Sequence, residues 1–240
     1  MSIDDLTGRV ALVTGGSGGI GAAICRQLAA AGVRVAVSYG SQRDPAERLA
    51  DEIGGAAFGA DMEDPEAPRR LVAETETALG AIDLLVANHG LARPAAYPDV
   101  DAAAFDRTLA VNLRAPFLLA QAALPGMRER GYGRILFMSS AAAFRGGVVG
   151  PDYAASKAGL HGLTFFLSSR VAPDGVTVNA VAPGFVETPM LPGDPTELGA
   201  RVPVGRVGRP EEVSDLVVAI LRNGYVTNHV FTIDGGMHPR

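Results

Sequence analysis

Tyr153 and Lys157 lie four residues apart, in the run Tyr153-Ala154-Ala155-Ser156-Lys157. On a helix, side chains four residues apart share one face, so this spacing predicts a phenol beside an ammonium group. A free tyrosine has a pKa near about 10 and exchanges few protons at neutral pH. A cation a few ångströms away can lower such a pKa by about 1–3 units, and Tyr153 would then exchange a proton with an alcohol–ketone pair. Because ordinary surface helices also carry this spacing, the spacing alone does not identify a catalytic pair. The rest of the chain must supply further evidence.

A glycine-rich turn, Thr14-Gly15-Gly16-Ser17-Gly18-Gly19-Ile20-Gly21, lies between a predicted strand and a predicted helix. Backbone without Cβ atoms can approach a pyrophosphate closely, and a helix N-terminus offers unpaired N–H groups with partial positive charge. A plain tight turn is the alternative interpretation. The strand before and the helix after are the context in which this motif binds dinucleotides, so the sequence predicts a dinucleotide cofactor.

The end of the second predicted strand bears on the choice between the two nicotinamide dinucleotides. An acidic residue there would hold the ribose diol and repel a 2′-phosphate. No carboxylate occurs between Val37 and Arg43, and Ser41 and Arg43 could contact a phosphate. This favours NADP(H), with NAD(H) as the alternative. Arg43 could equally be a solvated residue in the first turn of a helix.

Short β-rich apolar runs alternate with longer segments whose apolar residues recur every three or four positions, which predicts a parallel sheet with crossover helices. The strands are predicted at Val10–Thr14, Val33–Ser38, Ala56–Gly59, Leu84–Asn88, Arg134–Ser139, Thr177–Ala182 and His229–Ile233. The helices are predicted over 19–31, 44–53, 64–79, 101–129, 153–172 and 211–222. Pro116 and Pro125 would bend or split the helix over 101–129, and the Pro/Gly-rich stretch 189–208 is predicted to be a loop or lid.

Composition indicates an ordinary globular protein, with 48% hydrophobic and 20% charged residues in a chain of 240. We expect one domain over residues 1–240, because no repeat, linker or low-complexity tract divides it. The net charge is −5, and the basic residues are scattered, so we expect no nucleic-acid partner. No long apolar run predicts a membrane span. The acidic start, Met1–Leu6, does not resemble a signal peptide, and the single cysteine, Cys25, excludes an internal disulfide, so we expect a cytoplasmic protein.

Six motifs, taken together, resemble the short-chain dehydrogenase/reductase family over nearly the whole chain. They are Thr14-Gly15-x-x-x-Gly19-Ile20-Gly21, Asn88-His89-Gly90, Val111-Asn112-Leu113, Ser139-Ser140, Tyr153-x-x-x-Lys157 and Val178-Asn179-Ala180-Val181-Ala182-Pro183-Gly184. The resemblance implies a doubly wound α/β fold of the Rossmann type, with seven parallel strands in the order 3-2-1-4-5-6-7 flanked by helices. It also implies a homotetramer, in which the helices near 101–129 and 153–172 pack against symmetry mates.

Within the family the chain looks most like the β-ketoacyl-(acyl carrier protein) reductases. The similar segments are Asn179–Thr188, Gly205-Arg206-x-Gly208-x-Pro210-Glu211-Glu212 and Asp234-Gly235-Gly236-Met237. This similarity implies NADPH-dependent reduction of a β-ketoacyl thioester or similar small ketone to the secondary alcohol. The alternatives are an NAD(P)-dependent dehydrogenase of a small alcohol, polyol or steroid on the same machinery, and a non-catalytic dinucleotide sensor. The substrate would be delivered free, on coenzyme A or on an acyl carrier protein.

The resemblance implies a catalytic set of Asn112, Ser140, Tyr153 and Lys157. Ser140 would donate a hydrogen bond to the substrate carbonyl, and it is preferred over Ser139 because it lies thirteen residues before the tyrosine. Tyr153 would protonate the alkoxide. Lys157 would lower the pKa of that tyrosine and bind the ribose hydroxyls of the cofactor, and Asn112 would hold a water that relays protons from solvent.

The family's cofactor contacts, carried over by position, extend over several loops. The resemblance implies Gly15, Ser17, Gly19, Ile20 and Gly21 at the pyrophosphate, Asp61 and Met62 at the adenine, Asn88 and Gly90 at the adenosine ribose, and Pro183, Gly184, Val186 and Thr188 at the nicotinamide amide, beside Tyr153, Lys157, Ser41 and Arg43. No metal site is expected.

Four features depart from the family pattern. His89 replaces a common alanine, either lining the pocket or packing within its loop, and Gly18 and Gly40 occupy positions where NADP-using relatives often carry hydroxyl or basic residues. Asp174 stands where carrier-protein reductases often have a basic residue, and it would repel an acidic carrier protein. The short, Pro/Gly-containing loop 191–201 predicts an open substrate pocket. Phe144, Arg145, Val149 and Phe185 are expected to shape this pocket with it.

Overall fold

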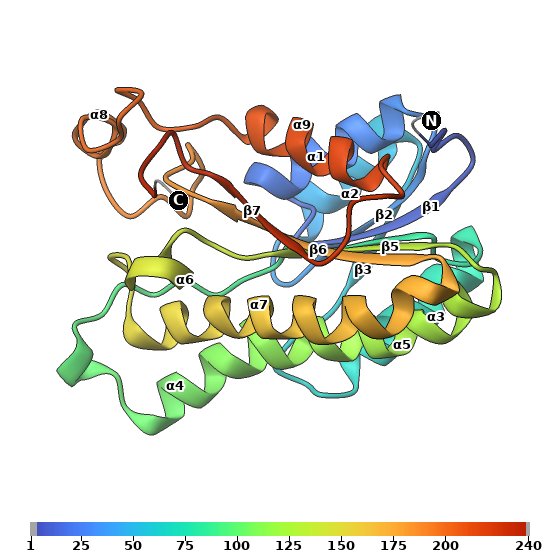
Figure 1. Cartoon of the computed structure of the whole chain (residues 1–240), viewed down its shortest axis with the longest axis horizontal. Coiled ribbons are helices and arrows are strands. Elements are labelled where there is room, and N and C mark those ends of the chain that lie inside the picture. Colours follow the sequence, from blue (N-terminus) through green and yellow to red (C-terminus); the bar gives the residue numbers. More distant parts are fainter. Residues whose placement is uncertain (1–3, 239–240) are drawn as a thin grey trace.

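In the computed structural model, which describes residues 4–238, one sheet of parallel strands runs through the centre of the molecule (Figure 1). Its order is β3-β2-β1-β4-β5-β6-β7, as the family resemblance implied. The strands are β1 (Val10–Thr14), β2 (Arg34–Tyr39), β3 (Ala56–Gly59), β4 (Leu84–Ala87), β5 (Gly133–Met138), β6 (Val176–Pro183) and β7 (His229–Ile233). The structure therefore confirms the predicted fold class and strand order.

Helices cover both faces of this sheet (Figure 1). The longer ones are α1 (Gly19–Ala30), α2 (Arg43–Ile53), α3 (Ala67–Leu79), α4 (Ala102–Leu109), α5 (Ala115–Glu129), α7 (Pro151–Val171) and α9 (Pro210–Leu221). Helices α1, α2 and α9 lie on one face, and α3, α5 and α7 lie on the other (Figure 1). No helix within residues 4–238 is long and apolar enough to cross a membrane.

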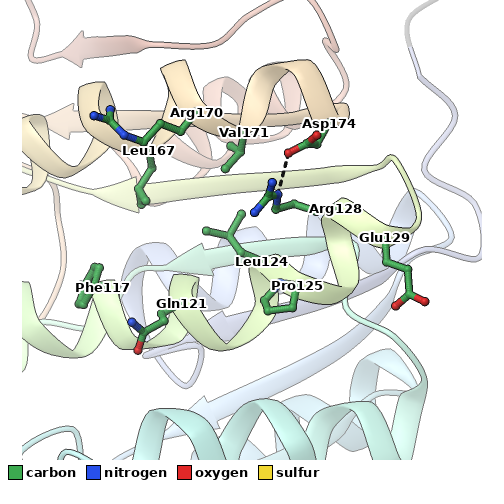
Figure 2. A pocket seen from close by; sticks show the side chains of 10 residues that line it. All are labelled: Phe117, Gln121, Leu124, Pro125, Arg128, Glu129, Leu167, Arg170, Val171 and Asp174. Carbon is green, nitrogen blue, oxygen red and sulfur yellow. Dashed lines mark hydrogen bonds and ion pairs between the residues drawn. The ribbon is translucent and has the colours of Figure 1, made fainter.

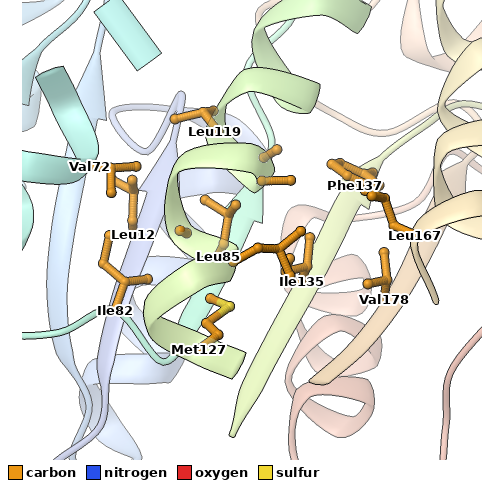
Figure 3. Close-up of a cluster of buried hydrophobic side chains, with 14 of the residues drawn as sticks. Leu12, Val72, Ile82, Leu85, Leu119, Met127, Ile135, Phe137, Leu167 and Val178 are labelled. Atoms are coloured by element: carbon orange, nitrogen blue, oxygen red, sulfur yellow. The ribbon is translucent and has the colours of Figure 1, made fainter. Parts of the chain in front are cut away.

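Alternating side chains of each strand build two hydrophobic cores, one on each face. Leu12 of β1 packs with Leu85, Ile135 and the helices α3, α5 and α7 (Figure 3), whereas its neighbour Val13 belongs to the core under α1, α2 and α9. Both faces of a parallel sheet are buried in this way, which explains why its strands are apolar throughout. Each fully buried Leu or Ile side chain contributes about 1.5–3 kcal/mol to folding.

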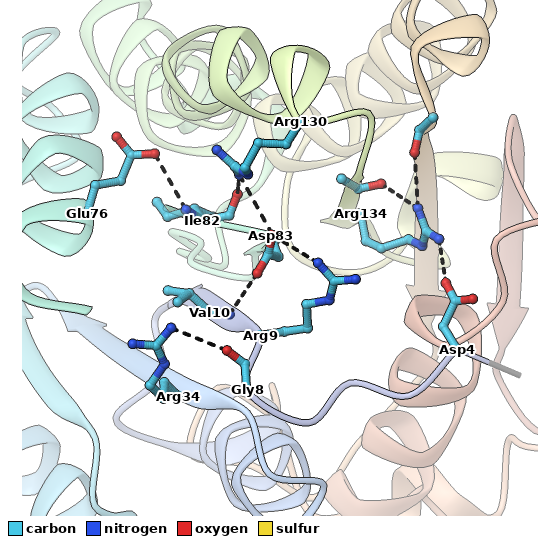
Figure 4. Close-up of polar contacts among 12 residues, drawn as sticks. Asp4, Gly8, Arg9, Val10, Arg34, Glu76, Ile82, Asp83, Arg130 and Arg134 are labelled. Carbon is cyan, nitrogen blue, oxygen red and sulfur yellow. Dashed lines mark hydrogen bonds and ion pairs between the residues drawn. The ribbon is translucent and has the colours of Figure 1, made fainter. Parts of the chain in front are cut away.

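Charged side chains form a cluster at the amino edge of the sheet, where the strands begin. Asp83 precedes β4 and accepts a hydrogen bond from the Val10 N–H at 3.2 Å. The guanidinium groups of Arg9 and Arg130 lie 3.6 and 3.8 Å from its other carboxylate oxygen (Figure 4). This largely buried cluster joins the starts of β1 and β4 to the end of α5, so the carboxyl edge is left to carry the loops that form the site.

The chain differs from the sequence-based prediction most clearly over 101–129. The predicted single helix is α4 and α5 joined by a π-helical segment, Ala110–Arg114. Pro116 lies in the first turn of α5, while Pro125 lies inside this helix. Two short helices, α6 (Ala142–Arg145) and α8 (Pro195–Gly199), were not predicted, and short 3₁₀ turns occur at Tyr97–Asp99 and Ala172–Asp174.

Candidate active site

The loops after β1, β4, β5 and β6 meet at the carboxyl edge of the sheet, where ligands bind in open α/β folds. A Cβ placed on Gly15 of the first loop would lie 2.9 Å from the His89 Cα of the second. A Cβ on Gly19 would lie 3.0 Å from a methyl carbon of Thr188, which follows β6. The structure thus brings predicted contacts for the pyrophosphate, the adenosine ribose and the nicotinamide to one place.

The glycine turn fits the close backbone approach that a pyrophosphate requires. Gly15 has φ +61°, a conformation that side chains other than glycine rarely adopt, and a Cβ on Gly21 would lie 2.1 Å from the Gly15 carbonyl oxygen. Asn88 fixes the turn, because its amide donates to the Thr14 and Gly15 carbonyl oxygens at 3.0 and 3.1 Å. The turn runs directly into the N-terminus of α1, which supplies N–H groups for an anion.

The residues expected at the adenosine end of the cofactor do not all line one pocket. A pocket of about 270 Å³ is lined by Gly40, Asp61 and Arg70, among others, and Arg70 is a cation that the sequence analysis did not single out. Met62 is buried in the hydrophobic core instead. Arg43 is 71% exposed at its side chain and ion-paired with Glu47 on its own helix, which is the solvated arrangement that the sequence left open.

The two adjacent serines have different roles. The Ser139 hydroxyl is buried, where it donates to the Lys157 carbonyl oxygen at 3.0 Å and contacts His161 Nε2 at 2.8 Å. Ser140 lies beside Tyr153, where its hydroxyl acts to lower the pKa of the phenol, and its hydroxyl oxygen accepts from the Ala142 N–H at 3.1 Å. The partner that the catalytic proposal requires for Tyr153 is therefore Ser140, as the thirteen-residue spacing indicated.

The pKa of Tyr153 departs from the sequence-based expectation in its direction. Burial raises this pKa above the usual value for a tyrosine, and the hydrogen bond with Ser140 only partly opposes the effect. Lys157 lies on the same side of α7, with its Nζ 5.8 Å from the centre of the Tyr153 ring. The expected lowering by Lys157 was wrong for this structure, since spacing predicts proximity but not desolvation. Burial therefore makes Tyr153 a weaker acid in this structure than a free tyrosine.

Lys157 is buried, and its ammonium group donates to the Met138 carbonyl oxygen at 2.7 Å. Burial lowers the pKa of Lys157 to about 8, so the side chain is mostly charged at neutral pH. A Cβ on Gly90 would lie 3.3 Å from the Lys157 Nζ. This places the cation between the end of β5 and the loop expected to contact the cofactor ribose.

Asn112 lies in the π-helical segment and joins two other parts of the site. Its amide oxygen accepts from the Leu91 N–H at 2.7 Å, and its amide nitrogen donates to the Leu91 carbonyl oxygen and to Ser156 Oγ at 2.9 and 3.1 Å. The side chain therefore holds the loop after β4 against α7. π-Helical turns interrupt the usual pairing of backbone carbonyls and often occur at functional sites.

His89 is packed within its loop rather than open to the pocket. Its Nε2 lies 2.9 Å from the Val111 carbonyl oxygen, and its Nδ1 lies 2.6 Å from the Thr14 hydroxyl. Because Val111 can only accept, Nε2 carries the proton and Thr14 donates to Nδ1. Burial, together with the nearby charge of Lys157, lowers the pKa of His89 to about 4.

We expect His89 to make the protein less stable in acid. In the unfolded chain a histidine binds its proton near pH 6.5, whereas folded His89 does so only near pH 4, so the stabilisation is complete above pH 6.5 and is lost as the pH falls towards 4. The loss amounts to about 3 kcal/mol. Urea unfolding of the wild type and of His89→Gln between pH 7 and pH 4 measures it. Parallel pH profiles for the two proteins would show that His89 is not responsible.

The structure places Tyr153 and Lys157 at the same edge of the sheet as the glycine turn, an arrangement that fits an NAD(P)-dependent oxidoreductase acting on ketones and alcohols. Residues 9–197 match the family model described as short chain dehydrogenase. The chain belongs to the short-chain dehydrogenase family, as its motifs indicated.

Named relatives agree with this class. The chain is 37% identical over 237 residues to the acetoacetyl-CoA reductase of Rhizobium meliloti (strain 1021), covering 96% of this chain and 98% of the relative. It is 37% identical over 243 residues to a 3-oxoacyl-(acyl-carrier-protein) reductase of Aquifex aeolicus (strain VF5), with 97% and 98% covered. A solved short chain dehydrogenase from Burkholderia cenocepacia J2315 in complex with NADP superposes with a TM-score of 0.89 at 37% identity, covering 98% and 99% of the two chains.

Proposed function

We propose that this protein uses NADPH to reduce a β-ketoacyl thioester, or a similar small ketone, to the secondary alcohol. The observation that carries the proposal is geometric: Tyr153 lies beside Ser140, with the Lys157 Nζ 5.8 Å from its ring, at the same edge of the sheet as the glycine turn. A protonated phenol suits reduction, since the alkoxide formed from a ketone needs a proton, whereas alcohol oxidation needs a base. Relatives named acetoacetyl-CoA reductase and 3-oxoacyl-(acyl-carrier-protein) reductase support the thioester class.

Each residue of the site has its own role in the proposed reaction. A bound nicotinamide supplies the hydride that adds to the carbonyl carbon. Ser140 donates a hydrogen bond to the carbonyl oxygen, and Tyr153 gives its proton to that oxygen as negative charge develops there. The Lys157 ammonium group would stabilise this developing charge and would contact the ribose hydroxyls of the bound cofactor. The proton returns from solvent through a water held at Asn112, whose backbone carbonyl lies in the π-helical segment.

NADP(H) is the proposed cofactor, on two grounds. The end of β2 carries no carboxylate that would repel a 2′-phosphate, and solved relatives hold NADP or NADPH. Arg43 is ion-paired with Glu47, and Arg70, which lines the pocket that includes Gly40, is ion-paired with Asp64 at 2.6 Å. Ser41 and these two arginines are the candidate contacts for the phosphate. Arg70, Gly40 and Asp61 line the same pocket.

Charge at the far end of α7 favours coenzyme A, or a free ketone, over an acyl carrier protein. Arg128 of α5 donates to the Asp174 carboxylate at 2.6 Å (Figure 2). This ion pair neutralises Arg128, the cation that would otherwise attract an acidic carrier protein. Acetoacetyl-CoA is therefore the first substrate to test.

The outer faces of α5 and α7 support a homotetramer as the working assembly. A groove of about 670 Å³ runs between these helices, lined by Phe117, Leu124 and Leu167 among others (Figure 2). Phe165 and Phe166 of α7 are 50% and 54% exposed. Exposed apolar surface of this kind marks interaction sites, and a second copy of the chain would bury it. Light scattering that finds only monomer at micromolar concentration would contradict the assembly.

The proposal treats residues 1–240 as one cofactor-binding and catalytic domain, of which residues 1–3, at the start of the acidic segment Met1–Leu6, and residues 239–240 lie outside the described structure. We place it in the cytoplasm, which agrees with a single buried, unpaired cysteine, Cys25.

Initial-rate measurements test the function. Oxidation of NADPH is followed with acetoacetyl-CoA, the matching carrier-protein thioester, a diketone and a sugar, and the series is repeated with NADH. We expect the highest kcat/KM with NADPH and acetoacetyl-CoA. Binding of NADPH without turnover of any ketone would support a cofactor sensor instead. Faster turnover in the reverse direction, with an alcohol or polyol reducing NADP⁺ or NAD⁺, would support the dehydrogenase alternative.

A further inference from the structure

Helix α7, which carries the catalytic tyrosine, begins without a side-chain cap. Its N-cap residue is Gly150, which has no side chain to accept from the free N–H groups of the first turn, and Pro151 follows at the first helical position. Tyr153 is only the third residue of the helix. Uncapped first turns fray readily, so something else must hold Tyr153 in place.

Thr108 and Asp152 join this first turn to α4. The Thr108 hydroxyl donates to Asp152 Oδ2 at 2.6 Å, and the two residues are 4% and 6% exposed. The other carboxylate oxygen, Oδ1, is buried and has no hydrogen-bond partner among the described residues. A Cβ on Gly150 would lie 2.7 Å from that oxygen, so the glycine leaves room for it. Hydrogen bonds to a charged group are among the stronger ones in a protein interior.

A second link lies one helical turn further along both elements. Asn112 follows Thr108 by four residues, and Ser156 follows Asp152 by four residues. The Asn112 amide donates to Ser156 Oγ, which in turn donates to the Tyr153 carbonyl oxygen at 2.7 Å. Tyr153 therefore lies between two cross-links, one of which involves a residue of the proposed catalytic set and one of which does not.

We propose that Thr108 and Asp152 are positioning residues for Tyr153: their buried hydrogen bond replaces the missing helix cap and fixes the phenol toward Ser140. This inference rests on the proposed function, because it assigns the pair a role in that reaction. The pair touches neither the expected substrate position nor the glycine turn. Its loss should therefore lower kcat while leaving cofactor affinity unchanged. Misplacing a reacting group by about 1 Å can cost up to about a hundredfold in rate.

Three variants separate positioning from ordinary stabilisation. Thr108→Val keeps the side-chain shape and removes the donor, while Thr108→Ser keeps the donor. Ser168→Ala is the matched control, because Ser168 lies on the same helix and its buried hydroxyl donates to the Asn228 side chain at 2.8 Å, four turns beyond Tyr153.

We expect Thr108→Val to lower kcat for acetoacetyl-CoA about tenfold, with the Kd for NADPH within about twofold of wild type. Thr108→Ser should restore kcat, and Ser168→Ala should leave it unchanged. Amide hydrogen exchange at residues 154–157 should be about tenfold faster in Thr108→Val, and unchanged in Ser168→Ala, because opening of the first turn becomes easier.

Wild-type kcat in Thr108→Val, or an equal loss in Ser168→Ala, overturns the inference. If the wild-type protein reduces no ketone, the proposed function is wrong, and the exchange measurement still decides whether this pair holds the first turn of α7. Unchanged exchange at residues 154–157 in Thr108→Val would then show that it does not.

Discussion

Replacing Tyr153 with phenylalanine is expected to lower kcat for ketone reduction by about 10²–10⁴-fold, the usual contribution of a positioned acid. The substitution removes the hydroxyl beside Ser140, and the group proposed to give its proton to the alkoxide is then missing. The aromatic ring remains, with the Lys157 Nζ 5.8 Å from its centre. Steady-state rates of NADPH oxidation with acetoacetyl-CoA measure the loss.

Cofactor binding provides the control for this variant. The phenol contributes little to binding of the pyrophosphate, which depends on the turn around Gly15 and Gly21, so the Kd for NADPH should change by less than about threefold. Folding should also persist, since one lost hydrogen bond costs about 1 kcal/mol. A Tyr153→Phe protein that retains more than about a tenth of wild-type kcat would remove Tyr153 from the role of acid.

The strands of the fold could be predicted closely from the sequence. Val10–Thr14, Ala56–Gly59 and His229–Ile233 begin and end where the structure has them, because short apolar runs next to Gly, Asn or Asp have clear limits. The π-helical segment Ala110–Arg114 could not be predicted. Apolar side chains recur through it at helical spacing, and a change of backbone pairing from four to five residues leaves no mark on that pattern.

In the candidate site, the motifs predicted where side chains lie but not what surrounds them. Motif spacing predicted Ser140 rather than Ser139 beside Tyr153. In the structure the Ser139 hydroxyl donates to the Lys157 carbonyl oxygen, and Ser140 is the serine that acts on the Tyr153 phenol. Spacing also placed Lys157 on the side of Tyr153, yet it did not reveal that the lysine donates to the Met138 carbonyl oxygen or that burial dominates the pKa of the tyrosine. Desolvation depends on everything packed around a group, and no single motif encodes it.

Contacts between distant segments were the least accessible to prediction. Thr108 and Asp152 are 44 positions apart, and each is unremarkable in sequence, as a helical threonine and an acidic residue in a first turn. Arg70 likewise reaches the pocket beside Gly40 only because α3 packs next to the ends of β2 and β3. Such residues are identified once the fold has brought their elements together.

Replacing Lys157 with methionine is expected to abolish most activity and yet to stabilise the cofactor-free fold at neutral pH. Catalysis should fall by about a hundredfold or more, because the cation that stabilises the developing negative charge is gone. The opposite effect on folding follows from the pKa of Lys157, which burial lowers to about 8 from 10.5. Keeping the side chain charged in the folded state thus costs about 3 kcal/mol at pH 7, and methionine fills similar space without a charge.

The stabilising effect of Lys157→Met decreases as the pH rises, and urea unfolding can follow this decrease. Between pH 8 and pH 10.5 the unfolded wild-type chain binds more protons at Lys157 than the folded chain, so wild-type stability at this position rises with pH. The variant leaves the Met138 carbonyl oxygen without its donor, which offsets about 1–2 kcal/mol. We therefore expect Lys157→Met to be more stable than wild type by about 1–2 kcal/mol at pH 7, with the advantage vanishing by about pH 10. A variant that is less stable than wild type at pH 7 would mean that the buried ammonium group is held favourably, and would remove the physical basis for its lowered pKa.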